Sequence, residues 1–137
     1  MKQSFKLQIE NDISELNRLN ALLEQLAKEW KVPQKVSFQI NLALEEMVTN
    51  IINYGYEGTS SHTINLSFIL NGNVIIIQIE DDGRAFNPLS SPEPDTTESA
   101  EKRKIGGLGI HFVKKLMDTV TYARKNKKNI LTLQKKF

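Results

Sequence analysis

The sequence predicts a single α+β domain, residues 1–137, on three observations. Its length is that of one ordinary domain and is sufficient to bury a core. Two segments in the first half, 12–30 and 33–54, carry apolar residues at helical spacing. The second half is rich in short segments with strand patterns. This mixed order of elements predicts helices packed against a sheet.

Composition narrows the class of protein further. Apolar residues make up 39% and charged residues 25% of the chain, as in soluble globular proteins. The formal net charge of +2 is nearly balanced and does not indicate direct nucleic-acid binding. No apolar run is long enough to span a membrane, and the first ten residues lack the pattern of a signal peptide. With no cysteine to form disulfides or thiolate metal sites, we expect a cytoplasmic protein without a membrane partner.

A strand and a helix are predicted at the start of the chain. The segment FKLQIE, residues 5–10, alternates apolar and polar residues, which indicates a strand with one buried face. Asp12 and Glu15 have the spacing of a capping box, and apolar residues then recur at helical spacing to about Trp30. Pro33 ends this helix, because the residue before a proline avoids the helical region.

The second helix is predicted to begin at Pro33 and to end near Gly55. Its apolar stripe consists of Val36, Ile40, Ala43, Leu44, Met47, Val48 and Ile51. A polar stripe flanks the apolar one, because Glu46 and Asn50 are four residues apart and Asn53 follows one turn later. Taken alone, this polar stripe is more typical of a solvated helix side than of a binding site.

The remaining chain is predicted to form four strands and a third helix. Asn71-Gly72-Asn73 indicates a hairpin turn between two strands. Residues 74–77 are all apolar, which predicts a central strand covered on both faces. The polar segment 87–105 is too long for a simple connection and is a candidate lid. A helix begins at 106–109, and two strands then flank a lysine-rich turn, for which Arg124, Lys125, Lys127 and Lys128 predict a solvated hairpin.

Two further stretches suggest chemistry. Asp81 directly follows the most apolar strand, where an unpaired carboxylate would be costly unless it faced a pocket, although Asp82-Gly83 is also an ordinary turn pair. The glycines of 106–109 open a helix, where backbone N–H groups and the helix dipole favour an anion such as a phosphate. Such a start is more often a turn or packing device, and the Walker A and dinucleotide-binding patterns do not fit.

The order of these motifs resembles the Bergerat-fold ATPases, the superfamily of gyrase and the histidine kinases. The stretches NLALEEMVTNIINYGYEG, IEDDGRAFNP and GGLGIHFVKKLMDTVTYAR are most similar to the bacterial anti-sigma factor serine/threonine kinases. The resemblance implies a two-layer sandwich in which a mixed, mostly antiparallel sheet is covered on one face by about three helices. It also implies that 87–105 is an ATP lid.

The resemblance implies a role for individual residues. Glu46 matches the general base, Asn50 the Mg²⁺ ligand, and Asp81 the acceptor for the adenine amino group. The remaining residues expected to contact ATP are Asn53, Gly83, Ala85, the lid cations Arg103 and Lys104, and Gly107, Leu108 and Gly109 of the phosphate turn.

Two positions depart from the family pattern. Ala85 stands where Asp-x-Gly-x-Gly usually has its second glycine, which is tolerable only if that position needs no positive φ. Lys128-Asn129 replaces the Gly-Thr before the last strand, so an adenine contact through threonine is replaced, if at all, by the asparagine side chain.

The resemblance implies two alternative functions. In the first, the chain is an ATP- and Mg²⁺-dependent serine/threonine protein kinase that phosphorylates a small anti-anti-sigma partner with a STAS-type domain and sequesters a sigma factor. In the second, it is a catalytically weak, nucleotide-dependent switch that holds a partner. A homodimer is also expected, with the helix at 12–30 as its predicted contact surface.

Overall fold

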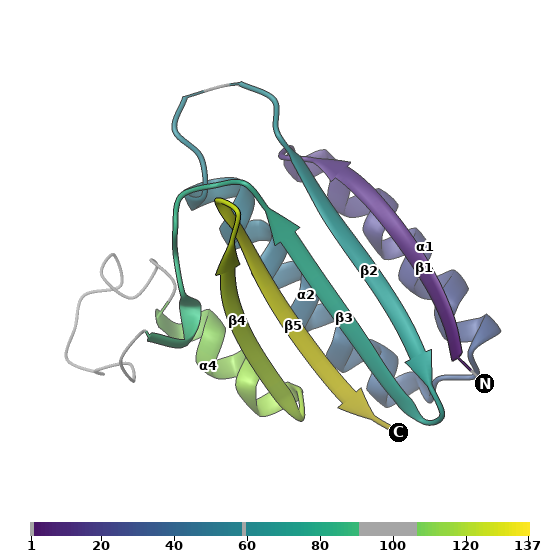
Figure 1. Cartoon of the computed structure of the whole chain (residues 1–137). Coiled ribbons are helices and arrows are strands. Elements are labelled where there is room, and N and C mark those ends of the chain that lie inside the picture. The colour runs from purple at the N-terminus through teal and green to yellow at the C-terminus, as the bar shows by residue number, and fades with distance from the viewer. Residues whose placement is uncertain (1, 59, 91–106) are drawn as a thin grey trace.

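The computed structural model describes residues 2–58, 60–90 and 107–137. They form a five-stranded sheet and three α-helices (Figure 1). The strands are β1 (Lys2–Glu10), β2 (Thr63–Asn71), β3 (Val74–Asp81), β4 (Thr119–Lys125) and β5 (Lys128–Lys136). The helices are α1 (Leu16–Glu29), α2 (Gln34–Tyr54) and α4 (Gly107–Leu116), with 3-10 turns η1 (Ile13–Glu15) and η2 (Pro88–Ser90).

All three α-helices cover the same face of the sheet, as expected for the two-layer sandwich (Figure 1). The strand order is β1-β2-β3-β5-β4, and each neighbouring pair is antiparallel. The predicted order of elements is therefore confirmed, with β3 at the centre. Among the described residues, no helix combines the length and apolar character needed to cross a membrane.

The prediction that β3 is covered on both faces is wrong. Ile75, Ile77 and Ile79 are buried under the helices, whereas Ile76 is partly exposed and Gln78 exposed on the other face. Since alternate residues of a strand point to opposite faces, the apolar run 74–77 places side chains on both sides although helices cover only one. The open face carries Ile76 next to Ile69 of β2.

The start of the first helix differs from the predicted capping box. Asp12 caps as expected, since its Oδ1 accepts a hydrogen bond from the Ser14 N–H at 3.0 Å. The Glu15 carboxylate, however, accepts from the Glu10 N–H at 2.8 Å instead of turning back to Asp12. The turn η1 therefore precedes α1, and the hydrogen bond from Glu10 to Glu15 connects the start of the helix to the end of β1.

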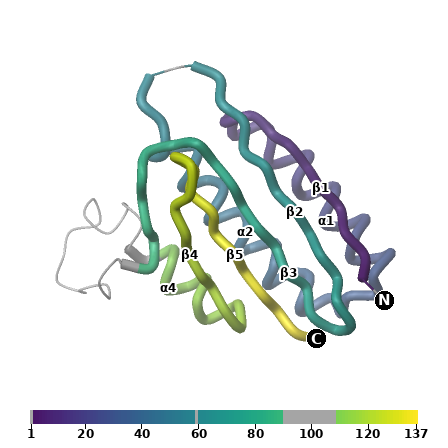
Figure 2. Tube along the Cα trace, in the orientation of Figure 1, coloured from purple at the N-terminus to yellow at the C-terminus, as the bar shows by residue number. Residues whose placement is uncertain are grey.

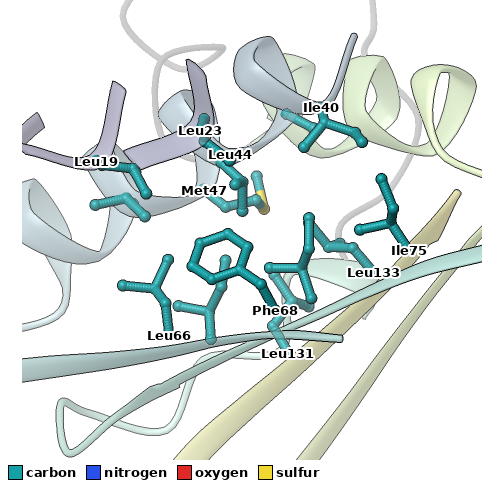
Figure 3. Packing of buried hydrophobic residues seen from close by; sticks show 14 of the residues in the cluster. Leu19, Leu23, Ile40, Leu44, Met47, Leu66, Phe68, Ile75, Leu131 and Leu133 are labelled. Carbon is teal, nitrogen blue, oxygen red and sulfur yellow. The ribbon is translucent and has the colours of Figure 1, made fainter. Parts of the chain in front are cut away.

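The core lies between the three helices and the sheet. Figure 3 shows Phe68 of β2 pointing toward Leu44 and Met47 of α2, with Leu133 of β5 close by. Leu44 has no exposed surface, and the residues of the predicted apolar stripe of α2 are buried or, at Val36 and Ile51, partly buried. The rows of α2 beside this stripe therefore lie at the edge of the helix layer, where Glu46 and Asn50 are found.

Truncation of Leu44 should test this packing. We expect Leu44→Ala to lower the free energy of unfolding by about 2–5 kcal/mol, because it removes a fully buried side chain and leaves a cavity. Phe38 lies on the same helix but is 63% exposed, so Phe38→Ala should change stability by no more than about 0.5 kcal/mol. Urea unfolding of both variants measures the difference, and equal losses would contradict this orientation of α2.

Candidate functional site

A cleft of about 330 Å³ lies between the C-terminal half of α2 and the ends of β3, β4 and β5. That volume is within the range of small-molecule sites. Its lining combines apolar side chains with a few polar ones. The lining residues are Met47, Asn50, Ile51, Tyr54, Gly55, Asp81, Arg84, Phe86, Pro88, Tyr122, Asn129 and Leu131.

Asp81 is the buried carboxylate of this cleft. It is the last residue of β3 and is only 5% exposed. Its Oδ1 accepts hydrogen bonds from the Gly83 N–H at 2.9 Å and from Asn129 Nδ2 at 3.1 Å. Burial raises the pKa of Asp81 above its ordinary value, while these two hydrogen bonds oppose that rise. The position predicted from the sequence therefore holds a partly satisfied charge facing a pocket.

Two small residues after Asp81 allow the chain to turn closely. A side chain on Gly83 would come within 2.5 Å of the Gly55 carbonyl oxygen at the end of α2, so only glycine fits there. Ala85 is exposed and does not have a positive φ, which explains why alanine is tolerated at the position where the family pattern has glycine.

Arg84 joins this turn to the end of α2. Its backbone N–H donates to the Gly55 carbonyl at 2.9 Å, and its Nε donates to the Tyr54 carbonyl at 2.7 Å. Carbonyl groups at a helix C-terminus lack donors within the helix, and here Arg84 provides two such donors. The floor of the cleft is thereby held to its helical wall.

Glu46 lies directly against the start of α4. A Cβ atom added to Gly109 would overlap the Glu46 carboxylate, so the two residues are in close contact. Glu46 belongs to α2 and Gly109 to the first turn of α4, two helices that pack on each other. The structure therefore brings together the glycine-rich helix start and the glutamate that the sequence placed far apart.

Asn50 and Asn53 differ in position. Asn50 lines the cleft one turn beyond Glu46, whereas Asn53 is exposed and is not among the lining residues. Glu45 is also exposed. Of the polar α2 residues singled out in the sequence, Asn50 thus lines the cleft and Glu46 contacts the start of α4.

Arg124 is exposed, as are Lys125, Lys127 and Lys128, which agrees with the predicted solvated hairpin, but its guanidinium also makes contacts that the sequence did not predict. Its Nη1 donates to the Gly83 carbonyl at 2.9 Å and to Asn129 Oδ1 at 3.0 Å. The turn itself, Asn126-Lys127, has positive φ at both residues and closes the β4–β5 hairpin. Figure 2 shows the segment after β3 passing beside this turn, which explains how Arg124 reaches Gly83.

Several predicted contacts with ATP remain predictions. Arg103 and Lys104 lie outside the described residues, as does most of the proposed lid. Gly107 and Leu108 begin α4, next to Gly109. The sequence did not single out the apolar walls of the cleft, which Met47, Ile51 and Leu131 supply. In the sequence, these residues have the same pattern as core positions.

Comparison with known proteins agrees with the fold. A family model described as histidine kinase-like ATPase domain matches residues 9–135. The chain is 24% identical over 111 residues to the serine/threonine-protein kinase BtrW of Bordetella bronchiseptica, a match covering 81% of the chain and 78% of BtrW. It is 26% identical over 98 residues to the anti-sigma F factor of Anoxybacillus flavithermus, covering 71% and 67%.

Other relatives are longer than the matched region. The serine-protein kinase RsbW of Oceanobacillus iheyensis is 33% identical over 86 residues, which cover 59% of this chain and 54% of that protein. The crystal structure of the RsbU and RsbW domains of Rv1364c from Mycobacterium tuberculosis has a TM-score of 0.71 at 15% identity. The match covers 98% of this chain and 32% of the Rv1364c chain, and it shows that the two share a fold.

The buried charge of Asp81 should reduce stability at neutral pH. Because its folded-state pKa is raised, the stability it contributes is full below its ordinary pKa and is lost as pH rises through the raised value. Asp81→Asn keeps an acceptor for Gly83 and Asn129, so its melting temperature at pH 7 should equal or exceed that of the wild type. Any excess should shrink as the pH falls toward 4.

An exposed carboxylate away from Asp81 provides the control. Glu45 on α2 is exposed, so Glu45→Gln should leave the melting temperature unchanged at pH 7. Calorimetry of both variants between pH 4 and 8 makes the comparison. A clear loss of stability in Asp81→Asn at pH 7 would contradict the assigned cost of burial.

Proposed function

Since the chain belongs to the histidine kinase-like ATPase domain family, we propose that it binds ATP with Mg²⁺ and transfers the terminal phosphate to a protein serine or threonine. The observation that carries the proposal is the contact between Glu46 and Gly109 beside the cleft that contains Asp81. It supports a site with a base-binding end at Asp81 and a phosphate end at the start of α4.

The two ends suit the two ends of ATP. Asp81 offers an acceptor in a mainly apolar cleft, as an adenine amino group requires. The start of α4 offers backbone N–H groups and the positive end of a helix dipole, as phosphates require. Asn50 lies on the cleft wall. Glu46 precedes it by one turn of α2 and lies beside the phosphate end.

Asn50 fits a magnesium site. Mg²⁺ prefers oxygen ligands and is commonly held by one or two protein groups together with substrate phosphates. In this proposal the Asn50 carboxamide oxygen is the protein ligand. When bound, the ion would neutralise charge that develops on the phosphates during transfer.

Glu46 fits the role of a general base. Its carboxylate touches the helix turn at which the terminal phosphate would lie, so it could accept the proton of an attacking hydroxyl there. Such proton transfer typically contributes about 100- to 10,000-fold to the rate. Positioning of the phosphate by the backbone of α4 would contribute much of the rest.

The relatives suggest the protein substrate. Two of them are named as serine- or serine/threonine-protein kinases, and a third is named as an anti-sigma F factor. We therefore propose that the phosphate acceptor is a STAS-type anti-anti-sigma protein and that a sigma factor is the second partner. A switch that binds nucleotide and partner without useful transfer is the alternative, and the unusual Ala85 and Asn129 leave room for it.

Replacing Glu46 should separate binding from transfer. We expect Glu46→Gln to reduce phosphorylation of a partner by about 100-fold or more while ATP affinity changes little, since the amide cannot accept the proton. Glu45→Gln is the matched control, because Glu45 is adjacent on α2 but exposed. The assay uses labelled ATP, Mg²⁺ and single-domain STAS-type candidates encoded beside the protein.

The outcomes distinguish the two functions. Label on a candidate that persists with Glu45→Gln and disappears with Glu46→Gln supports the kinase. ATP binding without transfer to any candidate favours the switch. Equal transfer by both variants would remove Glu46 as the base.

Replacing Asn50 should affect magnesium in particular. We expect wild-type protein to bind ATP more tightly with Mg²⁺ than with EDTA, and Asn50→Ala to lose most of that difference. In EDTA the variant and the wild type should bind ATP alike, which controls for damage to the cleft. Calorimetric titration measures both conditions. Full magnesium enhancement in Asn50→Ala would refute this ligand assignment.

A further inference from the structure

Asn129 has a buried carboxamide and lies beside Asp81 on the neighbouring strand. The two residues are paired in the register of β3 and β5, and both line the cleft. Asn129 is 7% exposed. Buried amide groups need partners for both the carbonyl oxygen and the NH₂ group, so the surroundings of Asn129 determine what it can offer to Asp81.

Five hydrogen bonds satisfy this carboxamide. Its Oδ1 accepts from three donors, which are the Tyr122 hydroxyl at 2.5 Å, Arg124 Nη1 at 3.0 Å and the Phe86 N–H at 3.4 Å. Its Nδ2 donates to Asp81 Oδ1 at 3.1 Å and to the Arg84 carbonyl at 2.8 Å. A guanidinium and a backbone N–H cannot accept, so turning the amide over would place donors against donors. Asn129 is therefore held with its NH₂ group toward Asp81.

This arrangement leaves Asp81 with one oxygen for a ligand. Oδ1 already accepts from Gly83 and Asn129, whereas Oδ2 has no hydrogen-bond donor in the described part of the chain. An ionised carboxylate can only accept hydrogen bonds. The cleft therefore presents an acceptor to the edge of a bound purine.

We infer that Asn129 is the positioning residue that makes the cleft select a purine with an amino group at C6 over one with a carbonyl there. This inference rests on the proposed binding of ATP and adds that base preference depends on a residue of β5 as well as on Asp81. Adenine offers a donor to Oδ2, whereas hypoxanthine would place its carbonyl oxygen against it. An unpaired polar contact of this kind is penalised in a buried site.

Loss of Asn129 would relax this preference for two reasons. The carboxylate would keep only Gly83 as a donor and would be less firmly oriented. Burial and the charge of Asp82 raise the pKa of Asp81, whereas Asn129, Gly83 and Arg124 lower it. Without Asn129 the protonated form becomes more favourable, and a protonated carboxyl can donate to the carbonyl of hypoxanthine.

Affinities for ATP and ITP, measured by calorimetry at pH 7.5 with Mg²⁺, test the inference. We expect the wild type to prefer ATP by roughly ten- to hundredfold. In Asn129→Leu, which removes both amide groups, the ratio should approach one. Asn129→Thr keeps a single hydroxyl and should give an intermediate ratio, which decides the matter if the leucine variant does not fold. Thr132→Val, on the same strand but facing the open side of the sheet, should keep the wild-type ratio.

A purely structural role for Asn129 predicts a different result. It would weaken ATP and ITP equally and leave their ratio unchanged, and that outcome overturns the inference. Equal affinity of the wild type for both nucleotides also overturns it, although ATP binding itself would stand. If the wild type binds neither nucleotide, the proposed function fails instead.

Discussion

The carboxylate of Asp81 is buried at the end of the central strand, and much of the site is arranged to accommodate it. A charge in such a place is costly unless donors surround it. Here one donor comes from the turn that follows β3 and the other from Asn129 on β5. Asn129 in turn is held by Tyr122 and Arg124 of β4. The need to satisfy one charge therefore couples three strands and the turn at the end of the cleft.

A second constraint, at the other end of the site, is steric. The Glu46 carboxylate occupies the space that a side chain at Gly109 would need, so α2 and α4 can approach closely only because that residue is glycine. The same approach brings a carboxylate to the N-terminal turn of a helix, where backbone N–H groups are unpaired. Packing of two helices thus creates the pairing of acid and anion-binding groups on which phosphate chemistry depends.

The sequence predicted the elements well because each depends on local pattern. The apolar stripe of α2 and the glycine of the 71–73 hairpin indicate their structures without reference to the rest of the chain. The covering of β3 was mispredicted because an apolar run does not reveal how many faces the helices cover. The hydrogen bonds of Arg124 could not be predicted for a similar reason, since they form only where the turn after β3 approaches β4.

The same reasoning applies to the site. Glu46, Asn50, Asp81 and Gly83 could be singled out because each belongs to a short motif that resembles the family pattern, but the hydrogen bond between Asp81 and Asn129 could not. Asn129 is 48 residues away from Asp81, and it makes five hydrogen bonds to residues of three segments, which are β3, the turn after β3 and β4. These contacts are formed within the protein itself, so the acceptor at Oδ2 is oriented before a base arrives and little reorganisation is needed on binding. A donor from the base would then offset part of the cost of the buried charge, so nucleotide binding should add to the stability of the fold.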